Sequence, residues 1–336
     1  MAYQRVEFPE YTTATLNRLL LQLTQSVHPD LRLTVVFADL PQEAVDVVFG
    51  DDGRVEFHVP LHFDSANTRD FLTNRWLCCW PMFAAVRLHH PELVGTCRLW
   101  VGDAPGGPGL AFCGNTVSHV LIPDSAFLES DGYAYLRGDA RARSMAWEER
   151  SDKIFWRGAS TGSREWLRLQ RWQDIPRFRL CLMVRQLNRP SEYDIGLSNI
   201  VQMWVPEEVA EVNAAELVLG HVDLLEFSRY KYGIDIDGNT CSWPGLFTKL
   251  LMAVTVIKVD SAMGYRQWYY DRLIPWKNFV PLTVSMDELP EISAWLRSHP
   301  AAARDIARRG HVLADSMTME RVIADMVPRI CEVVSR

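Results

Sequence analysis

The segment Lys153–Arg164, KIFWRGASTGSR, combines residue types that bind anions. Its apolar triplet IFW predicts a short buried strand, which leads through a loop of small residues into the start of a helix. Two guanidiniums, from Arg157 and Arg164, join a tight turn at Gly158 and the hydroxyl of Ser160. Together with the free N–H groups of a helix start, they suit a phosphate or diphosphate group. Strand–glycine–helix connections are also common in α/β proteins that bind nothing there, so this motif alone leaves both interpretations open.

A second chemical candidate is Asp103, which follows the predicted strand 97–101 and opens a loop rich in Gly and Pro, residues 102–109. A carboxylate in this position could act as a general base that takes a proton from a hydroxyl group. The alternative is an aspartate that caps its own turn.

A third group lies in residues 227–258. Asp235 and Asp237 form a DxD, and alternation on a strand would place both carboxylates on one face, as two metal ligands require. The Asp-Gly-Asn that begins at Asp237 is also a plain turn signal. Ser242 is a candidate helix N-cap and phosphate contact. Lys249, on the same predicted helix, is either a further phosphate contact or a solvated surface lysine.

Other motif classes are absent from the sequence, which holds no HExxH, GxxxxGK[ST] or strand-linked GxGxxG. This argues against a P-loop NTPase and a nicotinamide dehydrogenase. The seven cysteines are scattered and form no CxxC pair. They predict reduced thiols, and with no signal-type N-terminus and no membrane-spanning run we expect a cytoplasmic protein.

The composition is that of a globular protein with about two domains: 336 residues, of which 48% are hydrophobic and 23% charged. A net charge of −7 makes nucleic acid an unexpected partner. The charge is uneven, because residues 137–190 hold 13 Arg and Lys against 6 Asp and Glu. This basic block fits an anionic ligand or a solvated helix face.

Hydrophobic periodicity predicts the elements that carry these residues. The first half is expected to hold a helix at 13–27, a strand at 31–37, a hairpin at 45–59, a helical stretch at 67–90 that Pro81 splits, and strands at 97–101 and 117–122. The second half is expected to hold strands at 154–156, 178–184, 222–226, 232–236, 254–259 and 279–282, with helices at 163–172, 243–252, 264–273, 289–299, 302–314 and 318–334.

This alternation predicts a parallel sheet with helices on both faces. Ligands of such sheets bind at the carboxyl ends of the strands. Arg157, Asp237 and Asp103 each follow a predicted strand, so they could line one cleft between the two halves of the chain.

Several further motifs follow one another in the order and spacing of a known family. They are Trp147 and Lys153 before FWRG (155–158), YKY (230–232) with DG (237–238), YYD (269–271) with Leu273, PW (275–276), FVP (279–281), Trp295 with His299, and IARRG (306–310). From about Trp147 to its end the chain resembles the Rumi/protein O-glucosyltransferase family, glycosyltransferase family 90. The likeness is to short forms such as the bacterial lipopolysaccharide-modifying members.

The resemblance implies an α/β fold of GT-B type, with two Rossmann-like domains whose parallel sheets face a central cleft and with C-terminal helices packing across. Residues 1–145 would form the acceptor-side domain and residues 146–315 the nucleotide-sugar domain. Residues 316–336 would form a terminal helix that packs back on the first domain.

The resemblance also implies site residues. Asp103 would be the catalytic base. The donor diphosphate would lie on Arg157, Gly158, Ser160, Arg164, Ser242 and Lys249, and the nucleotide on Tyr230, Lys231, Tyr232 and Asp237. Family members are inverting and need no metal or other cofactor. Eukaryotic members carry an arginine where this chain has Pro244. The positive charge that this arginine would bring to the diphosphate would come here from Arg164 or Lys249.

The expected function is that of an inverting, metal-independent transferase that uses a UDP-sugar, UDP-glucose or UDP-xylose. Its acceptor would be a saccharide, glycolipid or protein, with peripheral membrane contact as an open question. Two alternatives stay open: a degenerate family member that binds nucleotide or glycan without turnover, and a metal-dependent transferase that uses Asp235 and Asp237.

Overall fold

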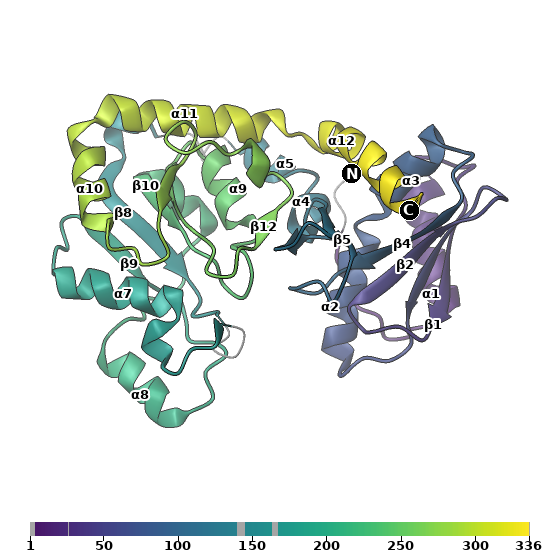
Figure 1. Cartoon of the computed structure of the whole chain (residues 1–336), viewed down its shortest axis with the longest axis horizontal. Coiled ribbons are helices and arrows are strands. Elements are labelled where there is room, and N and C mark those ends of the chain that lie inside the picture. Colours follow the sequence, from purple (N-terminus) through teal and green to yellow (C-terminus); the bar gives the residue numbers. More distant parts are fainter. Residues whose placement is uncertain (1–3, 26, 140–144, 163–166, 336) are drawn as a thin grey trace. The chain divides into compact units, whose positions relative to one another are not determined.

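The structure is a computed structural model that describes residues 4–25, 27–139, 145–162 and 167–335 (Figure 1). The chain divides into two compact units. The N-terminal unit comprises residues 1–132 and 317–336, and the C-terminal unit comprises residues 133–316. Each unit has its own β-sheet, and each is described by itself below.

The sheet of the N-terminal unit has the strand order β1-β3-β2-β4-β5-β7. The strands are β1 (Leu33–Ala38), β2 (Ala44–Phe49), β3 (Val55–Pro60), β4 (Gly95–Trp100), β5 (Gly109–Ala111) and β7 (His119–Leu121), and β6 (Cys113–Gly114) follows β5. The predicted hairpin at 45–59 is confirmed as β2 and β3, which pair antiparallel. Because its short turn forces antiparallel neighbours, β2 departs from the expected all-parallel sheet, whereas β1, β3, β4, β5 and β7 pair parallel where they meet.

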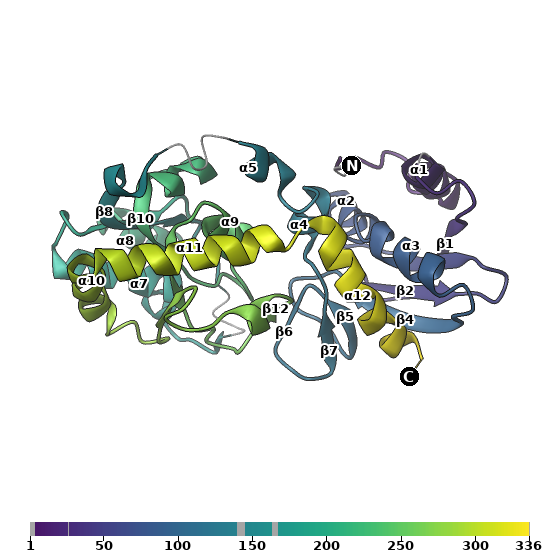
Figure 2. The same ribbon diagram turned by 90° about the horizontal axis from the view of Figure 1, so that it is seen from above.

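The N-terminal unit also contains helices. They are α1 (Thr13–Gln25), α2 (Ala66–Leu77), α3 (Trp80–His89), α4 (Ser125–Glu129) and α12 (Met319–Val334). The predicted stretch 67–90 is split, but at Cys78 and Cys79 rather than at the proline. Pro81 instead occupies the first turn of α3, where its missing N–H costs nothing. Figure 2 shows α12, which contacts α3 and β4 of this unit.

The C-terminal unit contains a parallel sheet with the order β13-β11-β10-β8-β9. Its strands are β8 (Ser151–Gly158), β9 (Tyr193–Leu197), β10 (Tyr230–Asp235), β11 (Thr255–Val259) and β13 (Val280–Leu282), with a short β12 (Arg266–Gln267). Its helices are α5 (Ala134–Gly138), α7 (Pro176–Leu187), α8 (Pro206–Ala214), α9 (Pro244–Leu251), α10 (Leu289–Ser298) and α11 (Pro300–Ser316). The 3₁₀ turns are η2 (Trp147–Glu149), η3 (Trp172–Asp174), η4 (Leu224–Arg229) and η5 (Tyr270–Arg272).

The core of the C-terminal unit joins apolar residues of α7 and α10 to one face of this sheet. Alternate residues of β10 point to that face, among them Ile234, while Asp235 points to the opposite face, toward α9. The expected α/β class, with a sheet in each of two units, is confirmed.

Three predicted elements of the second half are wrong. Residues 178–184 lie in helix α7, not in a strand, and Pro176 begins that helix. Residues 222–226 overlap the 3₁₀ turn η4. Residues 264–273 form β12 and η5 instead of a helix. Residues 163–166 of the predicted helix 163–172 lie outside the described residues, and its last residue, Trp172, begins the 3₁₀ turn η3. Among the described residues, no helix is both long and apolar enough to cross a bilayer.

Candidate functional site

Two loops of the C-terminal unit lie together at the carboxyl end of its sheet. Loop 159–162 follows β8, and loop 236–240 follows β10, which pairs parallel with β8. The loops touch at Gly238, where an added Cβ would lie 2.5 Å from Oγ1 of Thr161. Only glycine fits this close approach. The predicted clustering of these two segments is therefore present in the structure.

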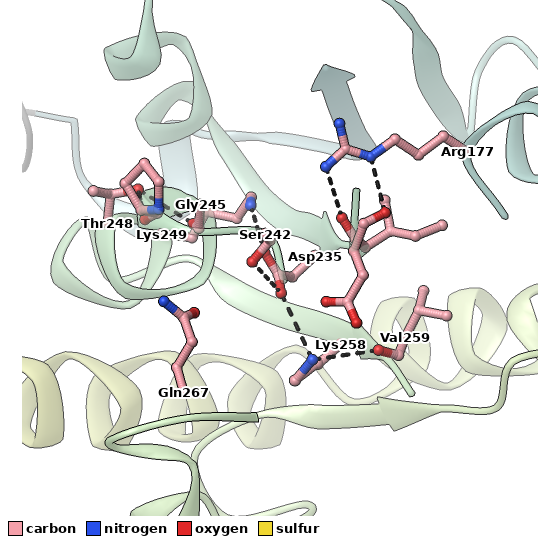
Figure 3. Close-up of polar contacts among 12 residues, drawn as sticks. Arg177, Asp235, Ser242, Gly245, Thr248, Lys249, Lys258, Val259 and Gln267 are labelled. Atoms are coloured by element: carbon pink, nitrogen blue, oxygen red, sulfur yellow. Dashed lines mark hydrogen bonds and ion pairs between the residues drawn. The ribbon is translucent and has the colours of Figure 1, made fainter. Parts of the chain in front are cut away.

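Arg177, at the start of α7, ties the two loops to each other. Figure 3 shows the contacts of its guanidinium with loop 236–240. In loop 159–162 its guanidinium donates to the carbonyl of Ala159 at 2.9 Å and to Oγ1 of Thr161 at 2.7 Å. In loop 236–240 it donates to the carbonyls of Ile236 at 3.1 Å and Asp237 at 3.0 Å. Burial lowers the pKa of Arg177 to about 10, and the nearby charge of Asp237 opposes this shift. The guanidinium stays charged at neutral pH and acts as a brace.

The sequence did not single out Arg177, because residues 178–184 read as a strand. Two signals could have found it. Residues 137–190 carry the basic excess, and Pro176 is the kind of residue that opens a helix.

One predicted diphosphate residue, Ser160, lies in loop 159–162, and two others, Gly158 and Arg164, lie next to this loop in the sequence. Gly158 is the last residue of β8, and a Cβ there would lie 2.8 Å from the Trp156 ring. Ser160 is 2% exposed, and its hydroxyl donates to the carbonyl of Val201 at 2.8 Å and accepts from the N–H of Val201 at 2.7 Å. Ser160 therefore holds the loop to the chain after β9 instead of presenting its hydroxyl. Arg164 lies outside the described residues.

A buried ion cluster on the other face of β10 contains Asp235, Ser242 and Lys249 (Figure 3). Asp235 is fully buried, and its carboxylate accepts from Nζ of Lys249 at 3.0 Å and from Oγ of Ser242 at 2.9 Å. Nζ of Lys258 lies 3.9 Å from the same carboxylate. Burial alone would raise the pKa of Asp235, but the two ammonium groups lower it overall. We call Asp235, Ser242, Lys249 and Lys258 the Asp235 cluster.

This cluster changes the roles that the sequence suggested for its members. Lys249 is 4% exposed, so the solvated-lysine alternative is wrong, and its ammonium is engaged by Asp235. Ser242 is not the N-cap of α9. Trp243 holds that position with φ +53°, a conformation uncommon for a bulky residue. Among the described residues, no three His, Cys, Asp or Glu side chains gather as a metal site would need.

Asp237 lies in a pocket between loop 236–240 and the residues that follow β11, among them Asp260, Ser261 and Met263. Burial raises the pKa of Asp237 to about 6, while the charge of Lys258 and the hydroxyl of Ser261 oppose the shift. Neither carboxylate oxygen has a hydrogen-bond partner of normal geometry among the described residues. A buried carboxylate without such partners is costly, and it is typical of a position that receives a ligand.

Asp237→Asn is expected to stabilise the C-terminal unit at neutral pH. Because the folded state raises the pKa of this carboxyl above its unfolded value, stability falls as pH rises from about 4 through about 6 and then levels off. The neutral amide removes that loss, which amounts to about 3 kcal/mol at pH 7.5. Urea unfolding of both proteins at pH 4.5 and 7.5 measures it. Equal stability of the two proteins at pH 7.5 would contradict the buried charge.

Arg157 and Tyr230 meet at a carboxylate that the sequence did not single out, Asp194 of β9. The guanidinium of Arg157 donates to Oδ1 of Asp194 at 2.6 Å, and the hydroxyl of Tyr230 donates to Oδ2 at 2.8 Å. The Tyr230 ring stacks on Phe155, with centroids 4.1 Å apart. Burial and the Asp194 carboxylate raise the pKa of Tyr230. Nε of Arg157 is buried and has no hydrogen-bond partner among the described residues, so one donor stays available.

The predicted nucleotide contacts Lys231 and Tyr232 lie with Tyr230 in the first half of β10, whereas Asp237 follows its last residue. Lys231 pairs with Asp152 at 2.7 Å, and the buried Tyr232 donates to the carbonyl of Leu296. At about 3.3 Å per residue, the two groups are separated by most of the strand. The structure therefore does not bring this triplet to loop 236–240.

Asp103 belongs to the N-terminal unit and follows β4 by three residues, as the sequence predicted. Its Oδ1 accepts from Nη2 of Arg75 at 3.1 Å, and the buried Arg75, from α2, also donates to the carbonyl of Val101. Glu43 lies beside this pair, because a Cβ on Gly102 would lie 2.4 Å from its carboxyl carbon. Burial, and then the charge of Asp103, raise the pKa of Glu43. Asp103 is 30% exposed, so it remains reachable by a ligand.

Comparison with known proteins gives one match to a family. The model described as Glycosyl transferase family 90 matches residues 133–331. Protein O-glucosyltransferase 3 of Rattus norvegicus is 24% identical over 222 residues, which are 64% of this chain and 39% of that protein. Protein O-glucosyltransferase 2 of Danio rerio is 26% identical over 178 residues, 51% of this chain and 31% of that protein. The chain thus spans about two fifths or less of the length of these relatives.

Two solved structures resemble parts of the chain. Anabaena Alr3699/HepE in complex with UDP-glucose has a TM-score of 0.36 and 14% identity, over 54% of this chain and 49% of that one. The pneumococcal O-GlcNAc transferase GtfA in complex with UDP and GlcNAc has a TM-score of 0.32 and 13% identity, over 56% of this chain and 37% of that one.

Proposed function

The chain belongs to glycosyl transferase family 90, and from this premise we propose that it moves a sugar, glucose or xylose, from a UDP-sugar to a hydroxyl group of an acceptor. The observation that carries the proposal is the extent of the family match. Residues 133–331 include loop 159–162, loop 236–240 and the Asp235 cluster. The acceptor in this proposal is a saccharide, glycolipid or protein, with a bacterial envelope saccharide as the first candidate.

The donor end of the proposal rests on the two loops at the carboxyl end of the parallel sheet. A diphosphate leaving group needs positive charge and N–H donors, and Arg157 is the penultimate residue of β8, just before loop 159–162. Arg177 contributes by holding both loops in place, since its donors are taken up by loop carbonyls and a hydroxyl. Asp237, buried and without normal hydrogen-bond partners, is the candidate acceptor for a hydroxyl of the nucleotide.

The acceptor end of the proposal rests on Asp103. In an inverting transfer the acceptor hydroxyl attacks the anomeric carbon from the side opposite the diphosphate. The new C–O bond forms as the bond to UDP breaks, the hydroxyl proton passes to the Asp103 carboxylate, and UDP leaves with the electron pair. Arg75 holds this carboxylate in place through a hydrogen bond to Oδ1.

We include metal independence in the proposal. Support comes from the Asp235 cluster, in which Lys249 and Ser242 take up the two oxygens of Asp235. A divalent cation on the DxD would have to displace a buried ammonium. The alternative enzyme, which uses Asp235 and Asp237 as ligands, would lose its activity in EDTA, whereas the proposed enzyme would not.

A cytoplasmic location is also part of the proposal, with the inner face of the membrane as the place where an envelope acceptor would be met. Support comes from the seven cysteines, all of which are free in the structure.

UDP and UDP-glucose are expected to raise the melting temperature, since a ligand that binds only the folded state stabilises it. GDP- and dTDP-sugars should have less effect.

Arg157→Ala should weaken UDP binding by roughly tenfold or more, because a hydrogen bond to a charged group contributes about 1.5–3 kcal/mol. Calorimetry measures the affinity. Arg304→Ala, which removes an exposed arginine paired with Glu148, serves as the control.

Slow hydrolysis of UDP-glucose separates turnover from binding alone. A chain that binds UDP-glucose but releases no glucose would favour the degenerate, binding-only family member. No stabilisation by any nucleotide sugar would remove the proposed function altogether.

A further inference from the structure

Two tryptophans of the C-terminal unit form an exposed aromatic surface outside the loops described above. Trp276 precedes β13 and Trp295 lies on α10, with ring centroids 5.0 Å apart in an edge-to-face arrangement. Trp276 is 46% exposed. Its backbone has φ +60°, which is unfavourable for a bulky side chain. An exposed tryptophan held in an unfavourable conformation indicates a function in binding more than in packing.

Two adjoining pockets share this tryptophan pair, and we call them together the Trp276 groove. The first pocket follows the outer edge of β13 and is bounded by Thr283, Glu288 and Glu291. The second lies on the other side of the pair. A groove made of two such pockets suits an extended occupant more than a single ring.

The second pocket continues over the start of α11 and is bounded by Lys277, Asp305 and Arg309. Asp305 is paired with Arg309 at 2.7 Å, so the charge that remains among these three residues is the single positive charge of Lys277. The first pocket, by contrast, adds Asp260 to its two glutamates and has no cationic lining residue. Its carboxylates would repel an anion and accept hydrogen bonds from hydroxyl groups.

The outer edge of β13 is closed to strand addition. β13 is an edge strand that pairs with β11, and its central residue, Pro281, has no N–H to donate. An extended peptide would therefore lack a continuous ladder along this edge. What the groove offers is aromatic faces with carboxylates and a hydroxyl along one side.

We propose that the Trp276 groove binds a neutral oligosaccharide. A sugar ring has an apolar C–H face, which fits against the exposed face of Trp276, and hydroxyls at its rim, which fit Glu288, Glu291 and Thr283. The two pockets would take successive sugar units. The role of this glycan as the acceptor, or the part of the acceptor beyond the reacting sugar, rests on the proposed function, whereas its binding does not.

The experiment measures binding of maltohexaose and cellohexaose, with a heparin hexasaccharide as the anionic comparison, by saturation-transfer NMR and calorimetry on the full chain. We expect a saturable signal for at least one neutral probe and a weaker one for heparin. Trp276→Ala should weaken it roughly tenfold. Trp276→Phe keeps an aromatic face and should lose much less. Trp204→Ala, which removes a tryptophan that is 86% exposed elsewhere in the same unit, should bind as the wild type does.

Three results would overturn the groove proposal. They are equal binding by Trp276→Ala and wild type, preference for heparin over both neutral probes, and no binding of either neutral probe. UDP-glucose binding in the same preparation keeps the two proposals apart. If the chain binds UDP-glucose but no oligosaccharide, only the groove proposal is contradicted. If it binds an oligosaccharide but no nucleotide sugar, only the proposed function is contradicted.

Discussion

Asp103→Asn is expected to lower the rate of sugar transfer by about 10²–10⁴-fold, the contribution of a positioned general base. The amide cannot take the proton of the acceptor hydroxyl. It can still accept the hydrogen bond from Arg75, so the loop after β4 should keep its conformation. Donor affinity should be unchanged, because the residues proposed for the donor lie in the C-terminal unit. Transfer is measured by release of UDP in the presence of acceptor, and donor binding by calorimetry.

Glu43→Gln tests which of the two neighbouring carboxylates is the base. Glu43 lies next to Asp103, and its raised pKa makes it the alternative proton acceptor. We expect this variant to retain most of the transfer activity. A large loss in Glu43→Gln together with normal turnover in Asp103→Asn would assign the base to Glu43. Asp51→Asn, in the exposed turn between β2 and β3, controls for a nonspecific effect of removing a carboxylate.

The second large effect is expected on stability. Asp235→Asn should lower the free energy of unfolding by about 3–5 kcal/mol, the usual result of leaving a buried charge without its partner. The amide keeps the shape of the side chain and its hydrogen bond with Ser242. It removes the negative charge that compensates Lys249 and Lys258, whose side chains are 5% and 9% exposed. Urea unfolding at neutral pH measures the loss.

A second substitution distinguishes loss of charge pairing from general damage to the core. Lys249→Met in the Asp235→Asn background removes the ammonium left unpaired, so the double variant should recover part of the stability. Asp305→Asn, which breaks only exposed ion pairs on α11, should have little effect. If Asp235→Asn costs no more than Asp305→Asn, the cluster is not a buried electrostatic unit.

Acidification should reproduce part of this loss. The folded state lowers the pKa of Asp235, so its contribution to stability is present above the unfolded pKa and is lost as pH falls through the folded one. The contribution of Asp237 to stability changes with pH in the opposite direction, because the folded state raises the pKa of Asp237 to about 6. Two aspartates on one strand end thus respond to pH in opposite directions, since one has cationic partners at contact distance and the other is mainly desolvated.

The sequence predicts well those features that local pattern determines. The hairpin of β2 and β3, strands β8, β10, β11 and β13, and the terminal helices all follow from hydrophobic periodicity and turn residues. α7 was misassigned because its apolar residues outweigh the start signal of Pro176 in a short window. With α7 read as a strand, Arg177 could not be recognised as the brace of the two loops.

The site residues also show that local sequence pattern does not predict contacts between distant segments. The DxD spacing describes Asp235 and Asp237 correctly as neighbours along the chain, but their environments depend on partners far away in sequence. Lys249 reaches Asp235 from 14 residues on, and Arg157 and Tyr230 meet through Asp194, which no motif marked. Periodicity reports which face a side chain is on. It does not report which other element packs against that face.

The brace formed by Arg177 also makes the first loop depend on a part of the chain that is synthesised later. Arg177 reaches back 18 residues to Ala159 and forward 59 residues to Ile236. A nascent chain that ended before β10 would contain the whole loop 159–162 and its arginine. It would lack two of the four hydrogen-bond partners that hold that arginine in place. The conformation of loop 159–162 is therefore a property of the completed parallel sheet, and a fragment that contains only the sequence of this loop would not adopt it.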